Sequence, residues 1–286
     1  MNARVLFPQP ALLPYINHYL FFEIGDPETW SDTNMAPPGC ASLSITTEKK
    51  TISIKENNNP AGKYESVTFV GQTTRFKKIF LYDRLKCFFV IFQPWGVYPL
   101  LGVHQGECRD ACISLSDLLG SSVRLFEEEL VEQTHTEDLQ RVVEKFFIKR
   151  ITDSRRQAQK KQTESFRLAN IVERIGLHSH QGTLIKKICR EEGFSLSRLE
   201  RHMRRIVGIS PKLYQRIMRF NMALQYIRRN KCCCNWSEVA SRFGYYDQTH
   251  FIKEFKLFYG KTPAEQSADD RFLSSIAKGM KKPTIS

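Results

Sequence analysis

The chain has 286 residues, of which 41% are hydrophobic and 26% charged, with a formal net charge of +13. This length indicates about two domains, since single cores stop growing beyond roughly 250 residues. The longest apolar run, Cys87–Phe92, is far shorter than the roughly 20 residues of a membrane-spanning helix. Pro8, Pro10 and Pro14 interrupt the apolar N-terminus and no small-residue cleavage site follows. We therefore expect a cytoplasmic chain with no membrane partner.

The excess of basic charge lies entirely in the C-terminal half. Residues 1–150 hold 16 Lys and Arg against 18 Asp and Glu, whereas residues 151–286 hold 27 against 12, an excess of +15. Such an asymmetry predicts a polyanionic partner for the second half, either a nucleic acid or an anionic membrane surface. Charge alone does not choose between the two.

The first hundred residues are typical of a β-rich domain, because short runs of β-branched and aromatic residues alternate with turn residues. The expected strands are His18–Ile24, Ser42–Thr47, Thr51–Lys55, Ser66–Val70, Lys77–Tyr82 and Leu85–Gln93. The expected breaks are Asp26–Pro27, Pro37–Gly39 and Asn57–Gly62. After Gly102 the apolar spacing becomes helical, with one helix starting near Thr136.

These patterns predict an α+β chain. A β-rich domain closed by helices is expected over residues 1–151, as a sensory or association domain. Residues 152–165 are polar and basic with almost no apolar residue, which favours a linker, either extended or as a solvated helix. An all-α domain is expected over residues 166–270, followed by a basic tail at 271–286.

The eight cysteines do not form a metal-binding pattern. Cys108 and Cys112 are four residues apart, Cys232–Cys234 are contiguous, and no Cys-x-x-Cys pair is followed by a second pair or by a His pair. We expect reduced thiols, no metal site and no cofactor. The isolated histidines, expected to be satisfied or surface side chains, are His18, His104 and His135.

The most specific feature is an internal repeat in the basic half, with copies 52 residues apart. The apolar positions and the stops of the first copy are Leu199, Met203, Ile206, Gly208 and Pro211. Their counterparts in the second copy are Phe251, Phe255, Phe258, Gly260 and Pro263. Each copy has a short amphipathic helix, a glycine turn, a polar helix start and a second amphipathic helix. This order predicts two helix-turn-helix units.

The second helix of each unit presents a hydroxyl and two cations opposite its apolar stripe. These residues are Ser197, Arg201 and Arg204 in the first copy and Thr249, Lys253 and Lys256 in the second. A helix fits the major groove of B-DNA, where such groups read base edges and contact phosphates. One such face alone would be an ordinary solvated surface, but two matching faces favour duplex DNA. A membrane-lying helix would need its apolar stripe free, whereas these stripes must pack a core.

A long helix is expected between the copies. Pro211–Arg229 has apolar residues at helical spacing, with proline in the first turn. A helix of this length spans on the order of 28 Å. Successive major grooves on one face of DNA are roughly 34 Å apart. The sequence therefore predicts that one polypeptide reads two adjacent major grooves.

The stretches Gly193–Leu224 and Gly244–Gln266 (GYYDQTHFIKEFKLFYGKTPAEQ) resemble the paired helix-turn-helix domain of the AraC/XylS-type transcriptional regulators. The resemblance implies sequence-specific binding to double-stranded DNA. It implies base-reading roles for Ser197, Glu200, Arg201, Gln248, Thr249, His250 and Lys253. Phosphate contacts are expected from Arg198, Arg204, Arg205, Lys256 and Lys261. For Glu200, an ion pair with Arg204 at i+4 is the alternative.

The N-terminal part also resembles a β-rich domain that precedes this DNA-binding domain in some bacterial regulators. The matching residues are Phe92–Leu101 (FQPWGVYPLL), Gly102 and Ser114–Gly120 (SLSDLLG). Its position is that of the family's effector-sensing domains. A small-molecule effector, a second copy of the chain and RNA polymerase are therefore candidate partners.

Two other functions would leave different signatures. A DNA-repair alkyl transferase fused to a helix-turn-helix domain would carry its nucleophilic cysteine after a proline, whereas Cys108 follows Glu107. The chain has no Gly-rich phosphate loop, His-Glu-x-x-His or Gly-x-Ser-x-Gly motif, so we expect no catalytic residue and no enzyme. An architectural protein of low specificity would use basic tails or apolar wedges instead of two ordered reading helices.

Overall fold

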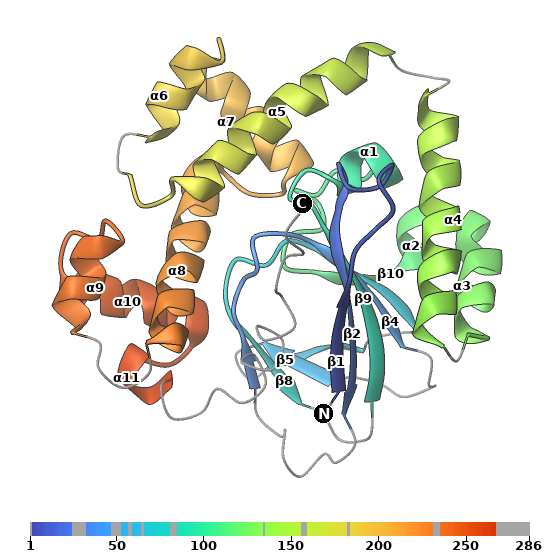
Figure 1. Ribbon diagram of the computed structural model, residues 1–286, viewed down its shortest axis with the longest axis horizontal. Helices are drawn as coiled ribbons and strands as arrows, with labels where there is room; N and C mark the ends of the chain where they lie inside the picture. The colour runs from blue at the N-terminus through green and yellow to red at the C-terminus, as the bar shows by residue number, and fades with distance from the viewer. Residues whose placement is uncertain are drawn as a thin grey trace, which may run out of the picture.

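The computed structural model describes residues 2–24, 33–46, 53–56, 59–63, 66–80, 85–133, 135–155, 159–181, 184–230 and 235–266. Figure 1 shows a sheet-rich N-terminal part flanked on one side by the helices of the C-terminal third. Each part buries its own hydrophobic cluster. The α+β fold predicted from the sequence is confirmed.

Two antiparallel sheets build the N-terminal part. The larger has the order β1-β2-β9-β4-β7-β10 and the smaller the order β3-β8-β5-β6. The strands of the larger sheet are β1 (Asn2–Leu6), β2 (Ile16–Ile24), β9 (Leu85–Phe92), β4 (Ser42–Thr46), β7 (Val67–Val70) and β10 (Cys112–Ser114). Those of the smaller are β3 (Thr33–Met35), β8 (Lys77–Phe80), β5 (Ser53–Glu56) and β6 (Asn59–Lys63).

The described part of this domain has four α-helices, which close it: α1 (Val97–Leu101), α2 (Leu115–Leu119), α3 (Arg124–Val131) and α4 (Thr136–Arg155). The start of α4 at Thr136 agrees with the predicted helix start. Its apolar face packs on the larger sheet, where the rings of Phe92 and Phe147 meet edge to face at 5.7 Å. Both side chains are fully buried, and each such burial stabilises the fold by about 1.5–3 kcal/mol.

Two stretches differ from the prediction. Asn57–Gly62 was expected to form a break, but β6 runs from Asn59 to Lys63, while residues 57 and 58 lie outside the described part. Among the described strands, β6 pairs only with β5, and an edge strand tolerates Pro60 because no ladder bond is needed from its outer side. The stretch after Gly102 is not helical throughout, because β10 pairs with β7 and completes the larger sheet.

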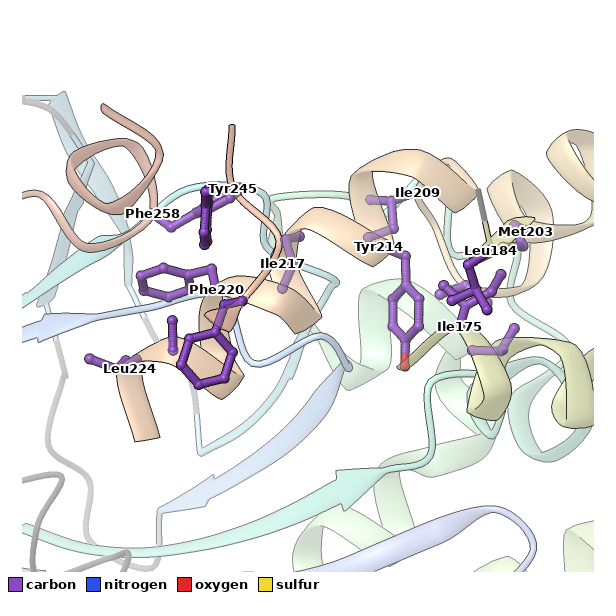
Figure 2. Close-up of a cluster of buried hydrophobic side chains, with 14 of the residues drawn as sticks. Ile175, Leu184, Met203, Ile209, Tyr214, Ile217, Phe220, Leu224, Tyr245 and Phe258 are labelled. Carbon is purple, nitrogen blue, oxygen red and sulfur yellow. The ribbon is translucent and has the colours of Figure 1, made fainter. Parts of the chain in front are cut away.

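Seven helices form the C-terminal part that the structure describes. They are α5 (Gln159–Leu177), α6 (Leu184–Glu191), α7 (Leu196–Ile206), α8 (Pro211–Arg229), α9 (Trp236–Arg242), α10 (Gln248–Tyr259) and α11 (Pro263–Gln266). Figure 2 shows side chains of α8 in two groups: Tyr214 lies near Met203 and Leu184, whereas Phe220 lies near Phe258. α8 therefore supplies the core of both halves of this domain.

Several predicted segments lie partly outside the described residues. In the stretch 152–165, predicted to be a linker, residues 152–155 end α4 and residues 159–165 begin α5. Residues 156–158, Cys232–Cys234 and the basic tail at 271–286 are not among those that the structure describes. The same holds for the expected break at Asp26–Pro27.

The described residues hold no helix long and apolar enough to cross a membrane, and no group of His, Cys, Asp and Glu placed to hold a metal ion. The free thiols among them are Cys40, Cys87, Cys108, Cys112 and Cys189. His18 on β2 is buried, with Nδ1 3.0 Å from Asn17 Oδ1. Burial lowers the pKa of His18 to about 4.

The buried His18 predicts a loss of stability in acid. Because its pKa rises from about 4 in the folded chain to 6.5 in the unfolded chain, protonation favours unfolding. Its contribution is complete above pH 6.5 and falls by up to about 3 kcal/mol as the pH drops toward 4. Urea unfolding of the wild type and of His18→Gln at several pH values measures it. A difference between the two chains that is constant from pH 7.5 to 4.5 contradicts this assignment.

Candidate nucleic-acid interface

The first helix-turn-helix unit consists of α6 and α7. Gly193, with φ +66°, makes the turn between them. Ser195 begins α7, because its Oγ accepts a hydrogen bond from the backbone N of Arg198 at 3.2 Å. Such a cap stabilises a helix by about 1 kcal/mol. Leu199 and Met203 are fully buried, which confirms the predicted apolar stripe.

The second unit, α9 and α10, repeats this construction. Asp247 Oδ1 accepts a hydrogen bond from the backbone N of His250 at 2.6 Å, and its charge complements the dipole at the start of α10. Gly244 has φ +68°, and a β-carbon there would collide with the carbonyl of His180. Phe251 and Phe255 are fully buried, as the sequence predicted.

The predicted base-reading residues of α7 lie on its exposed side. Ser197 and Arg201 are exposed. Glu200 is half-exposed and pairs with Arg204, with Oε1 2.9 Å from Nε and 2.7 Å from Nη2. This is the alternative role foreseen for Glu200. An exposed pair of this kind contributes only about 0.3–0.5 kcal/mol, so a DNA partner can replace it.

The corresponding residues of α10 are also exposed, and two of them are held in place. Gln248 Oε1 accepts a hydrogen bond from Ser237 Oγ at 2.8 Å, which joins the starts of α9 and α10. His250 Nδ1 accepts one from the backbone N of Tyr246 at 3.4 Å. Thr249 and Lys253 lie on the same exposed face. The structure therefore places all four exposed side chains on the first half of α10.

The predicted phosphate-contacting residues are less uniform. Arg198 stacks over the ring of Phe194 at 4.7 Å, and Arg205 lies 5.3 Å from the ring of Tyr98 in the N-terminal domain. Lys256 is exposed, whereas Lys261 is half-buried after the end of α10. Arg205 is therefore turned toward α1 of the neighbouring domain.

A hollow of about 530 Å³ lies beside α7. One side is formed by residues of α7 that include Ser197, Arg201 and Arg204, and the other by His104, Gly106 and Glu107 of the N-terminal domain. The exposed face of the first unit therefore borders the loop that follows α1.

A buried ion cluster that the sequence did not predict joins α10 to α8. Glu254 on α10 is 3% exposed, and its carboxylate lies 2.7 Å from Arg216 and 2.8 Å from Arg219, both on α8. Arg219 also lies over the ring of Tyr245 at 4.2 Å. The sequence signal for this cluster is the position of Glu254 between Phe251 and Phe255 of the buried apolar stripe. A buried charge at that position requires a partner of opposite charge. This cluster fixes α10 on α8.

The cluster predicts a local loss of stability in Glu254→Ala, since two guanidinium groups lose their counter-charge. We expect the free energy of unfolding to fall by about 3 kcal/mol. This is toward the lower end of the range for broken buried ion pairs, because Arg216 is partly exposed. Native-state hydrogen exchange of the α10 amides measures it, with Glu200→Ala on the exposed face of α7 as the control. Equal protection of α10 in the two variants contradicts this role.

A sequence family described as a helix-turn-helix domain matches residues 188–268, which contain α7 and the whole second unit. These residues therefore carry a helix-turn-helix domain, in the stretch whose sequence resembles the AraC/XylS-type regulators. A second family, described as a domain of unknown function (DUF6597), matches residues 4–114 and so covers the larger sheet. No curated protein sequence matches the chain.

Among solved structures, the chain is similar to ToxT from Vibrio cholerae. A 1.65 Å structure of ToxT has 12% identity and a TM-score of 0.47, and the alignment covers 87% of this chain and 97% of ToxT. ToxT from strain SCE256 with a bound unsaturated fatty acid has 12% identity and a TM-score of 0.44, over 88% and 94% of the two chains.

Proposed function

We propose that this chain is an AraC-type transcriptional regulator that binds duplex DNA sequence-specifically by placing α7 and α10 in two adjacent major grooves. The main support is that α7 and α10 have matching exposed faces and that both helices pack against α8. Ser197 and Arg201 on α7 have their counterparts in Thr249 and Lys253 on α10, and all four are exposed. α8 has 19 residues and spans on the order of 28 Å, near the roughly 34 Å between successive grooves.

The chemistry of the exposed groups supports base reading at the start of each helix. A guanidinium such as that of Arg201 can contact both major-groove acceptors of guanine, and an amide such as that of Gln248 can contact adenine. The further base readers in this proposal are Ser197, Glu200, Thr249, His250 and Lys253. Phosphate contacts are assigned to Arg198, Arg204, Arg205, Lys256 and Lys261, because phosphate contacts position the protein without reading sequence.

The variants Arg201→Ala and Lys256→Ala distinguish a contact with a base from a contact with a phosphate. Arg201 lies at the middle of α7, little more than one turn from its start, so its loss should cost about 1–3 kcal/mol and relax the preference at one base pair. Lys256 lies in the last turn of α10, so its loss should weaken all sequences equally and lower the salt slope by about 1. Selection from random DNA followed by salt titration measures both effects.

An unchanged selected motif in Arg201→Ala contradicts base reading by this residue. A changed motif in Lys256→Ala, with an unchanged salt slope, contradicts its role as a phosphate contact. The same selection distinguishes the alternative of an architectural protein, which would show little preference for any sequence over random DNA. Binding of DNA without catalysis accounts for every role proposed here.

We further propose that the N-terminal domain carries the regulatory input, through a small-molecule effector or through association of two copies, and that the DNA-bound chain contacts RNA polymerase. Support comes from a separate, near-neutral domain whose loop at residues 104–107 borders the reading face of α7. Thermal shift against a metabolite panel, together with a measurement of mass in solution, tests this input. Absence of any ligand, in a chain that stays monomeric on and off DNA, contradicts it.

A further inference from the structure

Both recognition helices end against the N-terminal domain. α7 ends at Ile206 and α10 at Tyr259. Each end is followed by one of the two repeat-related glycines, Gly208 and Gly260, which have φ of +92° and +80°. The last carbonyls of a helix have no partner within the helix and need donors from elsewhere.

At the end of α7 the donor is Gln105, in the loop that follows α1. Its backbone N donates to the carbonyl of Arg205 at 2.9 Å, and its Nε2 donates to the carbonyl of Ile206. The same Nε2 lies 3.0 Å from the carbonyl of Pro94. Gln105 is fully buried, and a β-carbon on Gly208 would lie 3.0 Å from its carbonyl oxygen. The loop therefore fits closely over the end of α7.

At the end of α10 the donor is Asn34 on β3. Its Nδ2 donates to the carbonyl of Tyr259 at 2.9 Å, and the side chain is 6% exposed. The ring of Phe76 covers Gly260 so closely that a β-carbon there would overlap with it. The two repeat-related helix ends are therefore held in the same way, each by a buried side-chain amide of the N-terminal domain.

The two donors belong to one braced unit. Asp110, in the loop of Gln105, accepts from the backbone N of Thr74 at 2.6 Å and from its Oγ1 at 2.8 Å. Lys77 Nζ donates to the carbonyl of Asp110 at 2.7 Å. Lys77 begins β8, which pairs with β3, the strand that carries Asn34. These bonds tie the Gln105 loop to the strands around Asn34, so the two donors hold a fixed separation.

We propose that Asn34 and Gln105 are positioning residues for DNA recognition. By holding the ends of α10 and α7, they fix the two reading helices relative to each other. The N-terminal domain thereby sets the spacing between the two half-sites that the chain accepts. This role rests on the proposed reading of two adjacent grooves.

Half-site spacing is a sensitive readout of this placement. One inserted base pair moves the second half-site by about 3.4 Å along the axis and turns it by about 34°. α7 joins α8 through a turn of only four residues, 207–210, and Gln105 sits on this turn at Gly208. Without the two amides, α8 alone would link the units, and a wider range of spacings should be bound.

The test uses the full chain and a DNA library in which two selected half-sites are separated by every spacing across one helical turn. The wild type is compared with Asn34→Ala/Gln105→Ala. The matched control is Gln93→Ala, which removes a side-chain amide bonded to the carbonyl of Leu13 within the N-terminal domain. Thermal unfolding shows whether each chain is folded. Where the alanine chain does not fold, Asn34→Leu/Gln105→Met removes the donors and keeps the volume.

We expect the wild type and the control to lose about tenfold in affinity per inserted base pair, the order of one mismatch. The double variant should still select both half-site motifs, but its affinity should fall by less than about threefold per inserted base pair. A double variant with the wild-type spacing preference overturns the positioning role and assigns spacing to α8 alone. A wild type that selects one half-site, with no second at a fixed distance, overturns two-groove reading and the positioning role with it.

Discussion

The DNA-binding domain depends on the packing of α8, because neither helix-turn-helix unit can bury its apolar stripe without it. Tyr214 and Ile217 of α8 belong to the same core as Met203 of the first unit, and the ring of Phe220 lies 5.3 Å from those of Phe255 and Phe258. Since both stripes pack against α8, this helix joins the two units and leaves one face of each recognition helix exposed. Arg216 and Arg219 of α8 also pair with Glu254 of α10. These ion pairs fix the orientation of α10 on α8, because their hydrogen bonds form in only one arrangement of the two helices.

The DNA-binding domain was predictable because its signals are local. The 52-residue repeat, the caps at Ser195 and Asp247, and the bounds of α8 all follow from side chains that act on their own helix. The same reasoning predicted the exposed face of each second helix, which includes Arg201 and Lys253, since an exposed face follows from the buried one opposite. The base-reading roles of Glu200, Gln248 and His250 came from the resemblance to the AraC/XylS-type regulators.

The rest depends on contacts between distant segments. β6 forms across Pro60 because β5 supplies an edge, and the pairing of β10 with β7 joins residues some forty positions apart. Glu254 needs cations that lie 35 and 38 residues earlier on another helix. The hydrogen bond from Gln105 to the end of α7 joins residues 101 positions apart, and that from Asn34 to the end of α10 joins residues 225 positions apart. Periodicity in a single sequence contains no information about such pairs.

Two successive major grooves on one face of DNA, read by one chain, should give a paired footprint. Methylation interference on a duplex selected by the full chain tests this reading most directly, because methyl groups at guanine N7 stand in the major groove. We expect two clusters of interfering guanines about one helical turn, or 10 base pairs, apart on one face. A single cluster, with no second one a turn away in duplexes that carry guanines there, would contradict it.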